Sequence, residues 1–463
     1  MTCVQRRVPM SHICPTCIGE PVLQRLVAAA ASAAHTCDYC DGELPAAEVW
    51  FVAQKCDEVL ATFYELSSQT MAVVHFDRTP VGEDLETTIQ QLVQVPQAAL
   101  EDIVETLQFM WYDRDSEDYR YGDDDPWFVL RTSMEAPLSE DWAAMESSLR
   151  GEARYLNPKV DRFMELVFGE IANDITINGG SVLVDAGSGS TYNALYRARV
   201  FQSEKGLNEA LQHPERFLGA PPAGIGAGGR MNAAGQPAFY GASDARTTLA
   251  EVRPPVGSWV VVAKFSVVRP LKLLDLTLLG QVQLREQASL FDVSTKTAAQ
   301  RRDFLRALSE KMTAPVMPDS QDRNYLITQV VADYLATHRR ASIDGIVYPS
   351  VQRNSDAHGA SGANIVLFHK AATAIDADTG GATAQAELWE YEEDGPQQYF
   401  RPTILYRPDK PQIIFRQPGF HPEPALQLIR DSIQIHRVQS IDIRTDVTDV
   451  EVLSLHPHHT KLA

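Results

Sequence analysis

The hydrophobic and polar positions of this chain follow different spacings in its two halves. Over residues 49–185, apolar residues recur at helical spacing, and Pro96 divides the first long helical segment into two. Ser139 is the predicted cap of a later helix, and Asn157 with Pro158 forms a cap and first-turn pair before the next. The pattern therefore predicts a mainly helical domain, interrupted by the charged segment DRDSEDYRYGDDDPW. We expect that segment to be a solvated loop, although its clustered acids suit a cation.

Beyond residue 186 the spacing becomes mixed. Short β-branched and apolar runs bounded by Gly and Pro predict strands, namely YRARV, SWVVVAKFSV, LKLLDLT, DGIVYPS and ANIVLFH. Between them, AAQRRDFLRALSEKM and NYLITQVVADYLATHRR predict amphipathic helices. We therefore expect an α+β domain over residues 186–372. A C-terminal extension, residues 373–463, adds strand-like pieces such as TILYR and QIIFR.

All six cysteines lie within the first 56 residues. Four of them form the pairs CPTC and CDYC, and 19 residues separate the pairs, which is the spacing of a structural zinc site. The predicted Zn²⁺ ligands, in a segment covering residues 1–48, are Cys14, Cys17, Cys37 and Cys40. Four protein ligands close the coordination sphere, so such a zinc is structural rather than catalytic. The alternatives are a redox pair, chance clustering, or replacement of one sulfur by His12 or His35.

The 463-residue chain has a formal net charge of -20 and a pI of about 5. Such a chain repels a polyphosphate backbone, which argues against nucleic acid as a partner. The longest candidate for a membrane-spanning run, LVAAAASAA, is too short to cross a bilayer. A signal-peptide core is the alternative reading of that run, but its place between two cysteine pairs favours an alanine-rich helix. We therefore expect a cytoplasmic protein without a membrane partner.

The segment GRMNAAGQPAFYGASDARTTLAEV, residues 229–252, has an arginine near its start and a glutamate near its end. The preceding GIGAGG matches G-x-G-x-x-G, but no strand leads into it and no helix follows, so a dinucleotide fold is disfavoured. We expect a glycine-rich loop carrying Arg230, a strand carrying Tyr240, and a helix capped near Ser243 that carries Glu251. On this interpretation Arg230 and Glu251 are opposite walls of one pocket.

Three segments, YRAR, GGRMN…AFYGASDARTTLAEV and DGIVYPSVQ, occur in this order and resemble the signature blocks of the RES domain. The resemblance extends over roughly residues 192–370. The N-terminal half is similar to the zinc-bearing segments that precede some RES domains in HEPN/RES proteins, but no R-x4-6-H ribonuclease motif is evident. The resemblance implies a fold like that of ADP-ribosyltransferases and a toxin acting on NAD⁺. By this resemblance, the family's functional residues correspond to Arg197, Arg230, Tyr240, Glu251 and Ser350. Met231 stands where the family more often has an aromatic residue.

These residue types suit NAD⁺ chemistry. Guanidinium groups bind phosphates bidentately, and Tyr240 offers a π face to the cationic nicotinamide. Glu251 can stabilise the oxocarbenium-like centre formed when the nicotinamide–ribose bond breaks, while Ser350 can hydrogen-bond the ligand. The expected catalytic residues are Arg197, Glu251 and Ser350, and the expected NAD⁺-binding residues are Arg197, Arg230, Tyr240 and Ser350. Taken singly, each of these residues also has a purely structural interpretation. The arginines can be surface charges, Tyr240 a core aromatic residue, and Glu251 a helix-end carboxylate. Asn364 and His369 are supporting groups or core residues.

The expected function is that of an NAD⁺-consuming toxin or antiphage defence effector, acting as a glycohydrolase with water or as a phosphorylase with phosphate. An ADP-ribosyltransferase that modifies a protein or nucleic acid is the first alternative, and a non-catalytic zinc-dependent binding module is the second. RES toxins are usually neutralised by a helix-turn-helix antitoxin encoded beside them. The resemblance therefore implies such an antitoxin, or self-inhibition by the N-terminal half. A homo-oligomer is compatible with the sequence.

Overall fold

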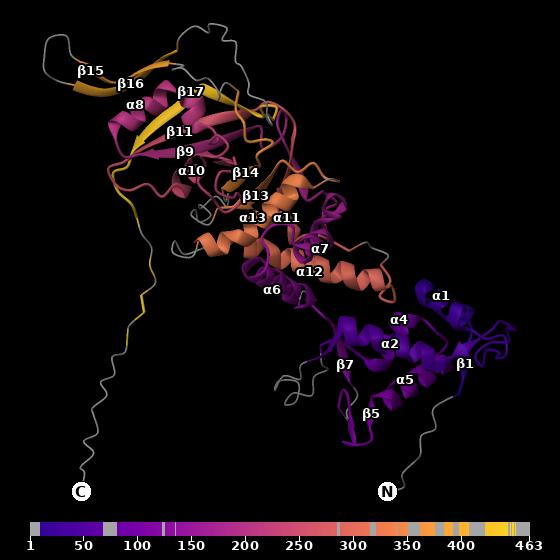
Figure 1. Ribbon diagram of the computed structural model, residues 1–463. Coiled ribbons are helices and arrows are strands. Elements are labelled where there is room, and N and C mark those ends of the chain that lie inside the picture. Colours follow the sequence, from indigo (N-terminus) through magenta and orange to yellow (C-terminus); the bar gives the residue numbers. More distant parts are fainter. Residues whose placement is uncertain are drawn as a thin grey trace, which may run out of the picture. The chain divides into compact units, whose positions relative to one another are not determined.

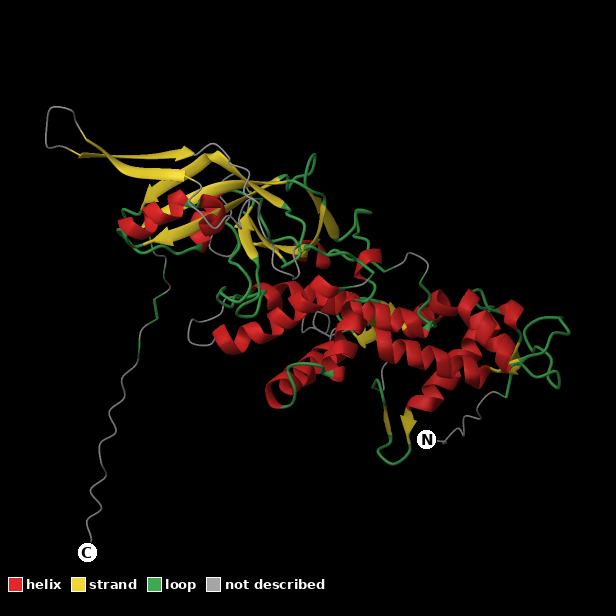
Figure 2. Ribbon diagram, turned by 45° about the horizontal axis from the view of Figure 1, so that its top comes forward, coloured by secondary structure: helices red, strands yellow, loops and turns green. Residues whose placement is uncertain are grey.

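The structure is a computed structural model (Figure 1). It describes residues 10–67, 81–122, 126–134, 136–284, 288–314, 321–338, 340–350, 362–375, 384–391, 398–406, 422–442, 445, 447–448 and 450. The chain divides into two compact units, the first formed by Met1–Asp185, Ala227–Gln236 and Leu271–Pro349, and the second by Ala186–Gly226, Pro237–Pro270 and Ser350–Ala463. Helices and strands occur in both units (Figure 2), in agreement with the predicted α+β class. Among the described residues, no helix is both long and apolar enough to cross a bilayer.

The first unit begins with the cysteine-bearing segment and a helical core. Its elements are β1 (His12–Ile13), η1 (Pro15–Cys17), α1 (Pro21–Ala30), β2 (Ala47–Glu48), α2 (Val49–Phe63), α4 (Leu85–Val93) and α5 (Gln97–Trp111). The apolar faces of these helices share one buried core. The predicted break at Pro96 is confirmed, because α4 ends before it and α5 starts directly after it. The first five residues of the alanine-rich run form the end of α1, as expected, whereas residues 31–34 follow the helix.

Short strands accompany this helical core. The strands β3 (Tyr64–Leu66), β4 (Glu83–Asp84) and β7 (Trp127–Leu130) form a small sheet in the order β3-β7-β4. The charged segment predicted to be a loop contains an antiparallel pair instead, β5 (Tyr112–Asp113) and β6 (Asp118–Tyr119). The tilted rings of Tyr112 and Tyr119 lie 5.1 Å apart across this pair. Such a cross-strand aromatic contact stabilises a hairpin despite the charges around it.

The remainder of the first unit combines helices with a parallel strand pair. Its elements are α6 (Ala136–Gly151), α7 (Pro158–Phe168), η2 (Ile171–Asn173), β8 (Leu183–Ala186), β12 (Leu271–Asp275), α11 (Leu276–Leu279), α12 (Val293–Thr313), α13 (Gln321–Thr337) and β13 (Gly345–Pro349). The predicted cap at Asn157 is confirmed, since its side chain accepts hydrogen bonds from the Lys159 and Val160 amides. The cap predicted at Ser139 is wrong, because α6 begins three residues earlier and Ser139 lies inside its first turn. Arg301 on α12 binds Asp174 with two hydrogen bonds, of 2.8 and 2.6 Å.

The second unit is built on an antiparallel sheet with the strand order β17-β11-β9-β10-β14. Its elements are β9 (Ala194–Phe201), α8 (Glu204–Gln212), α9 (Pro214–Leu218), β10 (Phe239–Ala242), α10 (Ala245–Glu251), β11 (Trp259–Val267), β14 (Ala363–Leu367), β15 (Ala384–Tyr391), β16 (Gln398–Tyr406) and β17 (Leu426–Arg437). The strands β15 and β16 form a separate antiparallel pair. All predicted strands of this unit are confirmed, including TILYR in β16, whereas QIIFR (412–416) lies outside the described residues.

The alternation of side chains along β9 decides which residues share a face of this sheet. Helix α10 packs through Ala245, Leu249 and Val252 on the face that carries Tyr196 and Ala198. We call this side of the sheet the α10 face. Since side chains of consecutive strand residues point to opposite sides, Arg197 and Arg199 project from the other face.

Candidate functional site

Helix α10 is anchored at its start by side chains that follow β10. Asp244 caps the helix by accepting a 2.9 Å hydrogen bond from the Thr247 amide, and it also accepts from the Thr247 hydroxyl at 2.7 Å. Capping near Ser243 was expected, but Ser243 has a different task. Its Oγ accepts a 3.1 Å hydrogen bond from the Ala363 amide, which ties the helix start to β14. The helix therefore has a fixed origin on the sheet, from which it delivers Glu251.

The Glu251 carboxylate, at the last residue of α10, is held by two side-chain donors from distant segments. Ser350 Oγ donates to Glu251 Oε1 at 2.6 Å, and Asn364 Nδ2 donates to the same oxygen at 2.8 Å. Ser350 is 6% exposed and Asn364 is 5% exposed, whereas Glu251 is only partly buried. Within the described part of the chain, no hydrogen bond reaches Oε2. The arrangement therefore fixes one carboxylate oxygen and leaves the other available to a ligand.

A glycine makes this arrangement sterically feasible. A Cβ atom at Gly362 would lie 1.8 Å from Thr247 Oγ1, which no side chain can tolerate. The Gly362 carbonyl accepts a 2.9 Å hydrogen bond from the Ser350 amide. Because residue 362 has no side chain, the start of β14 passes directly under α10 and places Ser350 and Asn364 beside Glu251.

Tyr240 lies on the α10 face, as the site requires. On β10 it is two residues before Ala242, and Ala242 is paired with both Tyr196 of β9 and Asn364 of β14. Residues directly opposite in antiparallel strands share a face. Tyr240, Asn364 and α10 therefore belong to one side of the sheet.

Arg197 projects from the opposite face of the sheet. Its guanidinium carbon lies 4.9 Å above the Phe239 ring, and its Nη1 is shielded from solvent without a hydrogen-bond partner among the described residues. Burial lowers the pKa of Arg197 to about 10, with a further contribution from the positive charge of Arg199, so the group is charged at neutral pH. Strand alternation thus separates Arg197 from Glu251, and its expected catalytic role remains a prediction.

Arg230 lies in the first unit, where its guanidinium binds the C-terminal end of α12. Nη1 donates to the Met312 carbonyl and Nη2 to the Ala314 carbonyl, both at 2.9 Å, and the guanidinium lies 5.4 Å from the Tyr325 ring. Carbonyls at a helix C-terminus lack partners within the helix, so a cation is favourable there. Met231, which replaces the family's aromatic residue, is buried. The pairing of Arg230 with Glu251 across one pocket remains untested.

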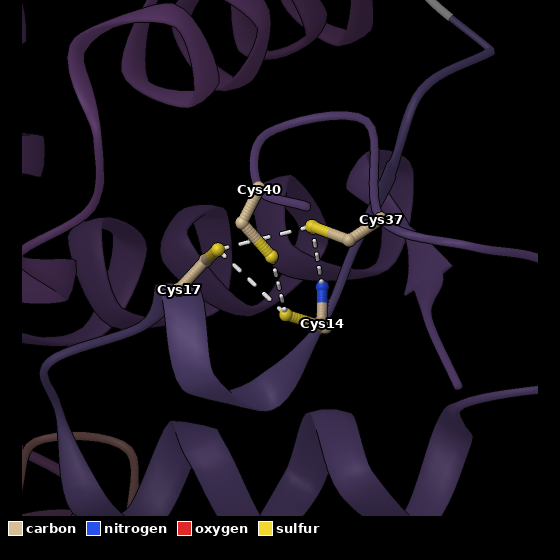
Figure 3. A group of neighbouring side chains, drawn as sticks. All are labelled: Cys14, Cys17, Cys37 and Cys40. Atoms are coloured by element: carbon tan, nitrogen blue, oxygen red, sulfur yellow. Dashed lines mark hydrogen bonds between the residues drawn. The ribbon is translucent and has the colours of Figure 1, made fainter. Parts of the chain in front are cut away.

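The four predicted zinc ligands form a compact cluster (Figure 3), with the sulfurs directed toward one another. Three Sγ–Sγ distances are 3.6, 3.6 and 3.8 Å, and all four sulfurs lie within 4.8 Å of one another. A tetrahedral Zn²⁺ site with Zn–S bonds of about 2.3 Å has sulfurs roughly 3.8 Å apart, so the donor set fits zinc. Burial raises the pKa of the Cys14 thiol, but hydrogen bonds from Thr16 and the neighbouring thiols outweigh it and lower the pKa to about 6.

Cys56 and the two nearby histidines lie outside this cluster. Cys56 is fully buried in the helical core, and Cys3 is outside the described residues. His12 and His35 stack on each other, with ring centroids 4.0 Å apart. Four sulfurs already complete a tetrahedron, so neither histidine is required as a ligand.

Sequence reasoning overlooked one charged residue of the α10 face. Lys264 is the single charge in the apolar run WVVVAKFSV of β11, and an isolated charge in a buried strand is the signal that identifies it. Its register opposite Tyr196 places it on the α10 face.

Comparison with known protein families supports the resemblance to the RES domain. Residues 194–390 match the family model of the RES domain, a family generally taken to be NAD-consuming toxins. The match begins with β9 and ends within β15, so it includes all five residues carried over from the family. The cysteine cluster precedes it. No curated protein matches the chain.

Proposed function

We propose that the RES domain at residues 194–390 cleaves the nicotinamide–ribose bond of NAD⁺, and that the protein is a toxin or defence effector of the glycohydrolase or phosphorylase type. The observation that carries this proposal is the Glu251 carboxylate, which is fixed through one oxygen by Ser350 and Asn364. The family of the domain supplies the class of substrate. The residues of the α10 face supply groups of the chemical types that the reaction needs.

In the proposed reaction, Glu251 acts on the positive charge that develops at the ribose as nicotinamide departs. A carboxylate oriented before the reaction stabilises that charge without reorganisation in the transition state. Two donors on Oε1 orient the group, and Oε2 faces the ribose or its acceptor. Ser350 Oγ uses its hydrogen in the bond to Glu251, so its lone pairs are available to a ligand hydroxyl. Tyr240 offers its ring to the departing nicotinamide.

The two arginines carried over from the family are proposed as phosphate ligands. The unpartnered Nη1 of Arg197 supports an anionic ligand, since a buried donor without a partner is destabilising. Arg197 projects from the face of the sheet opposite to Glu251. Ligand binding by Arg197 and catalysis by Glu251 are therefore tested separately. Arg230 would release the Met312 and Ala314 carbonyls to bind phosphate.

The product of NAD⁺ turnover tests the proposal most directly. The full-length protein is incubated with NAD⁺, with and without inorganic phosphate, and the products are identified by mass. We expect free nicotinamide together with ADP-ribose from water, or a phosphorylated ADP-ribose from phosphate. Intact NAD⁺ in the presence of correctly folded protein would refute the proposal. Glu209, exposed on α8, provides the control variant Glu209→Gln beside Glu251→Gln.

Transfer of ADP-ribose to a macromolecule remains the alternative for the same bond cleavage. A labelled NAD⁺ distinguishes the two, because a transferase leaves the label on protein or nucleic acid. A non-catalytic binding module is less well supported, since Arg197, Glu251 and Ser350 are all present. For regulation, we propose a separate antitoxin or inhibition by the N-terminal half. The cysteine cluster in that half is consistent with a structural zinc site.

A further inference from the structure

Four residues of the α10 face form a single row across four neighbouring strands. The registers pair Lys264 of β11 with Tyr196 of β9, Tyr196 with Ala242 of β10, and Ala242 with Asn364 of β14. Neighbouring strands are about 4.8 Å apart, so the backbone positions of Lys264 and Asn364 are roughly 14 Å apart. The row therefore joins a cation at one end to the amide that holds Glu251 at the other.

The ammonium of Lys264 contacts the aromatic ring of its neighbour in this row. Its Nζ lies 5.6 Å from the centroid of the Tyr196 ring, which is one strand closer to Asn364. Among the described residues, no carboxylate forms an ion pair with Lys264, and the side chain is only partly buried. A cation that is held by an aromatic ring but lacks an anionic partner is prepared for an anionic ligand.

We propose that Lys264 binds the pyrophosphate of the dinucleotide whose ribose lies at Glu251. This inference rests on the proposed function and adds a residue that the sequence motifs do not include. In NAD⁺ the pyrophosphate follows the nicotinamide ribose at a distance of several bonds, which matches a cation displaced along the row from the carboxylate. Arg197 projects from the other face of the sheet, whereas Lys264 shares a face with Glu251.

Binding of ADP-ribose tests this inference without requiring turnover. ADP-ribose contains the pyrophosphate but has no bond to cleave, and its affinity for the full chain is measured by calorimetry. Lys264→Met retains the apolar stem over Tyr196 and removes the charge, while Lys264→Arg retains a cation. Lys205→Met, at an exposed position on α8, is the matched control.

We expect Lys264→Met to weaken ADP-ribose binding by roughly 10- to 100-fold, the effect of losing one charge-assisted hydrogen bond. Lys264→Arg should bind within a few-fold of the unchanged protein, and Lys205→Met should be indistinguishable from it. The dependence of affinity on salt concentration should also become shallower in Lys264→Met, which a purely structural defect would not produce. Melting curves of each variant establish that the fold is retained.

Equal affinity of Lys264→Met and the unchanged protein would overturn the inference, as would an unchanged protein that does not bind ADP-ribose. The proposed function fails by a different result, namely intact NAD⁺ in the turnover assay. If NAD⁺ is cleaved, Lys264→Met should raise KM with little change in kcat, because the pyrophosphate contact is the same in the ground and transition states.

Discussion

Ser350 and Glu251 are 99 positions apart in the chain, yet the serine hydroxyl donates a 2.6 Å hydrogen bond to the glutamate carboxylate. The contact depends on three separate features: a capped helix that ends at Glu251, a glycine directly before β14, and a backbone hydrogen bond that fixes Ser350. None of these is visible in the two residues alone. The relationship makes Glu251 the natural first target for mutation.

Replacing Glu251 by glutamine should reduce turnover of NAD⁺ by about 100- to 1000-fold, the effect of removing one electrostatic group from a pre-oriented site. Glutamine retains an acceptor oxygen for Ser350 and Asn364 but carries no charge, so the fold should be preserved. Release of nicotinamide is the measurement, with Glu209→Gln as the control. A Glu251→Gln variant as active as the Glu209→Gln variant would remove Glu251 from the mechanism.

Ser350→Ala and Asn364→Ala should each lower kcat, and their effects should not be additive. Both donors act on Glu251 Oε1, so loss of either already frees the carboxylate. Contacting residues typically show interaction energies of about 0.5–3 kcal/mol in a double-mutant cycle. The cycle is measured on kcat at constant pH. Strict additivity of the two changes would show that the residues act independently.

Gly362→Ala should destabilise the second unit. The new Cβ would lie 1.8 Å from Thr247 Oγ1, and such overpacking typically costs about 1–3 kcal/mol of unfolding free energy. Gly151→Ala is the control, because a Cβ at that exposed position meets nothing within 4 Å. Denaturant titration measures both. A Gly362→Ala protein as stable as the Gly151→Ala protein would contradict the packing described here.

Cys14→Ser should lower the zinc content of the purified protein, whereas Cys56→Ser should leave it unchanged. The first residue belongs to the four-sulfur cluster and the second is buried in the helical core. Chelation should also lower the melting temperature, because Ile13 and Ile18 beside the cluster pack into that core. Metal analysis and thermal melting check these expectations. Unchanged zinc in Cys14→Ser would refute the site.

Arg197→Met should impair NAD⁺ turnover without lowering stability. The buried Nη1 has no partner in the described structure, so removing the charge should leave the unfolding free energy unchanged or raise it by about 1 kcal/mol. Binding of an anionic ligand would explain why the chain keeps the Arg197 guanidinium despite its cost to the unfolding free energy. The measurements are denaturant unfolding and KM for NAD⁺. Full activity in Arg197→Met would assign the residue no part in binding or catalysis.

Much of the fold follows directly from sequence patterns. The break at Pro96, the cap at Asn157 and the strands β9, β10, β11, β14 and β16 were predictable because local spacing and turn residues determine them. The strands β15 and β17 were not predicted. The cap of α10 was expected near Ser243 and is the next residue, Asp244. Both are good capping residues, and only the contact of Ser243 with β14 distinguishes them. The hairpin in the charged segment was missed because tyrosines opposite each other are recognised only after the register is known.

The site was predictable in residue type but only partly in arrangement. Order along the chain identified Glu251 and Ser350, which the fold brings into contact. The sequence could not reveal that Arg197 projects from the opposite face of the sheet. A strand residue can be assigned to one face only when its pairing with the neighbouring strands is known. For the same reason, Lys264 became visible only through the row that links it to Asn364.

The two hydrogen bonds on Glu251 Oε1 have a stereochemical consequence. A free carboxylate has two equivalent oxygens, and a substrate can approach either of them. With Oε1 engaged by Ser350 and Asn364, the two oxygens are no longer equivalent, and the proposed reaction leaves Oε2 for the ribose. In the proposed reaction, the carboxylate therefore meets the ribose through the same oxygen in every turnover. The anomeric configuration of the first product, resolved before it equilibrates in water, would show whether the acceptor also approaches the ribose from a single side.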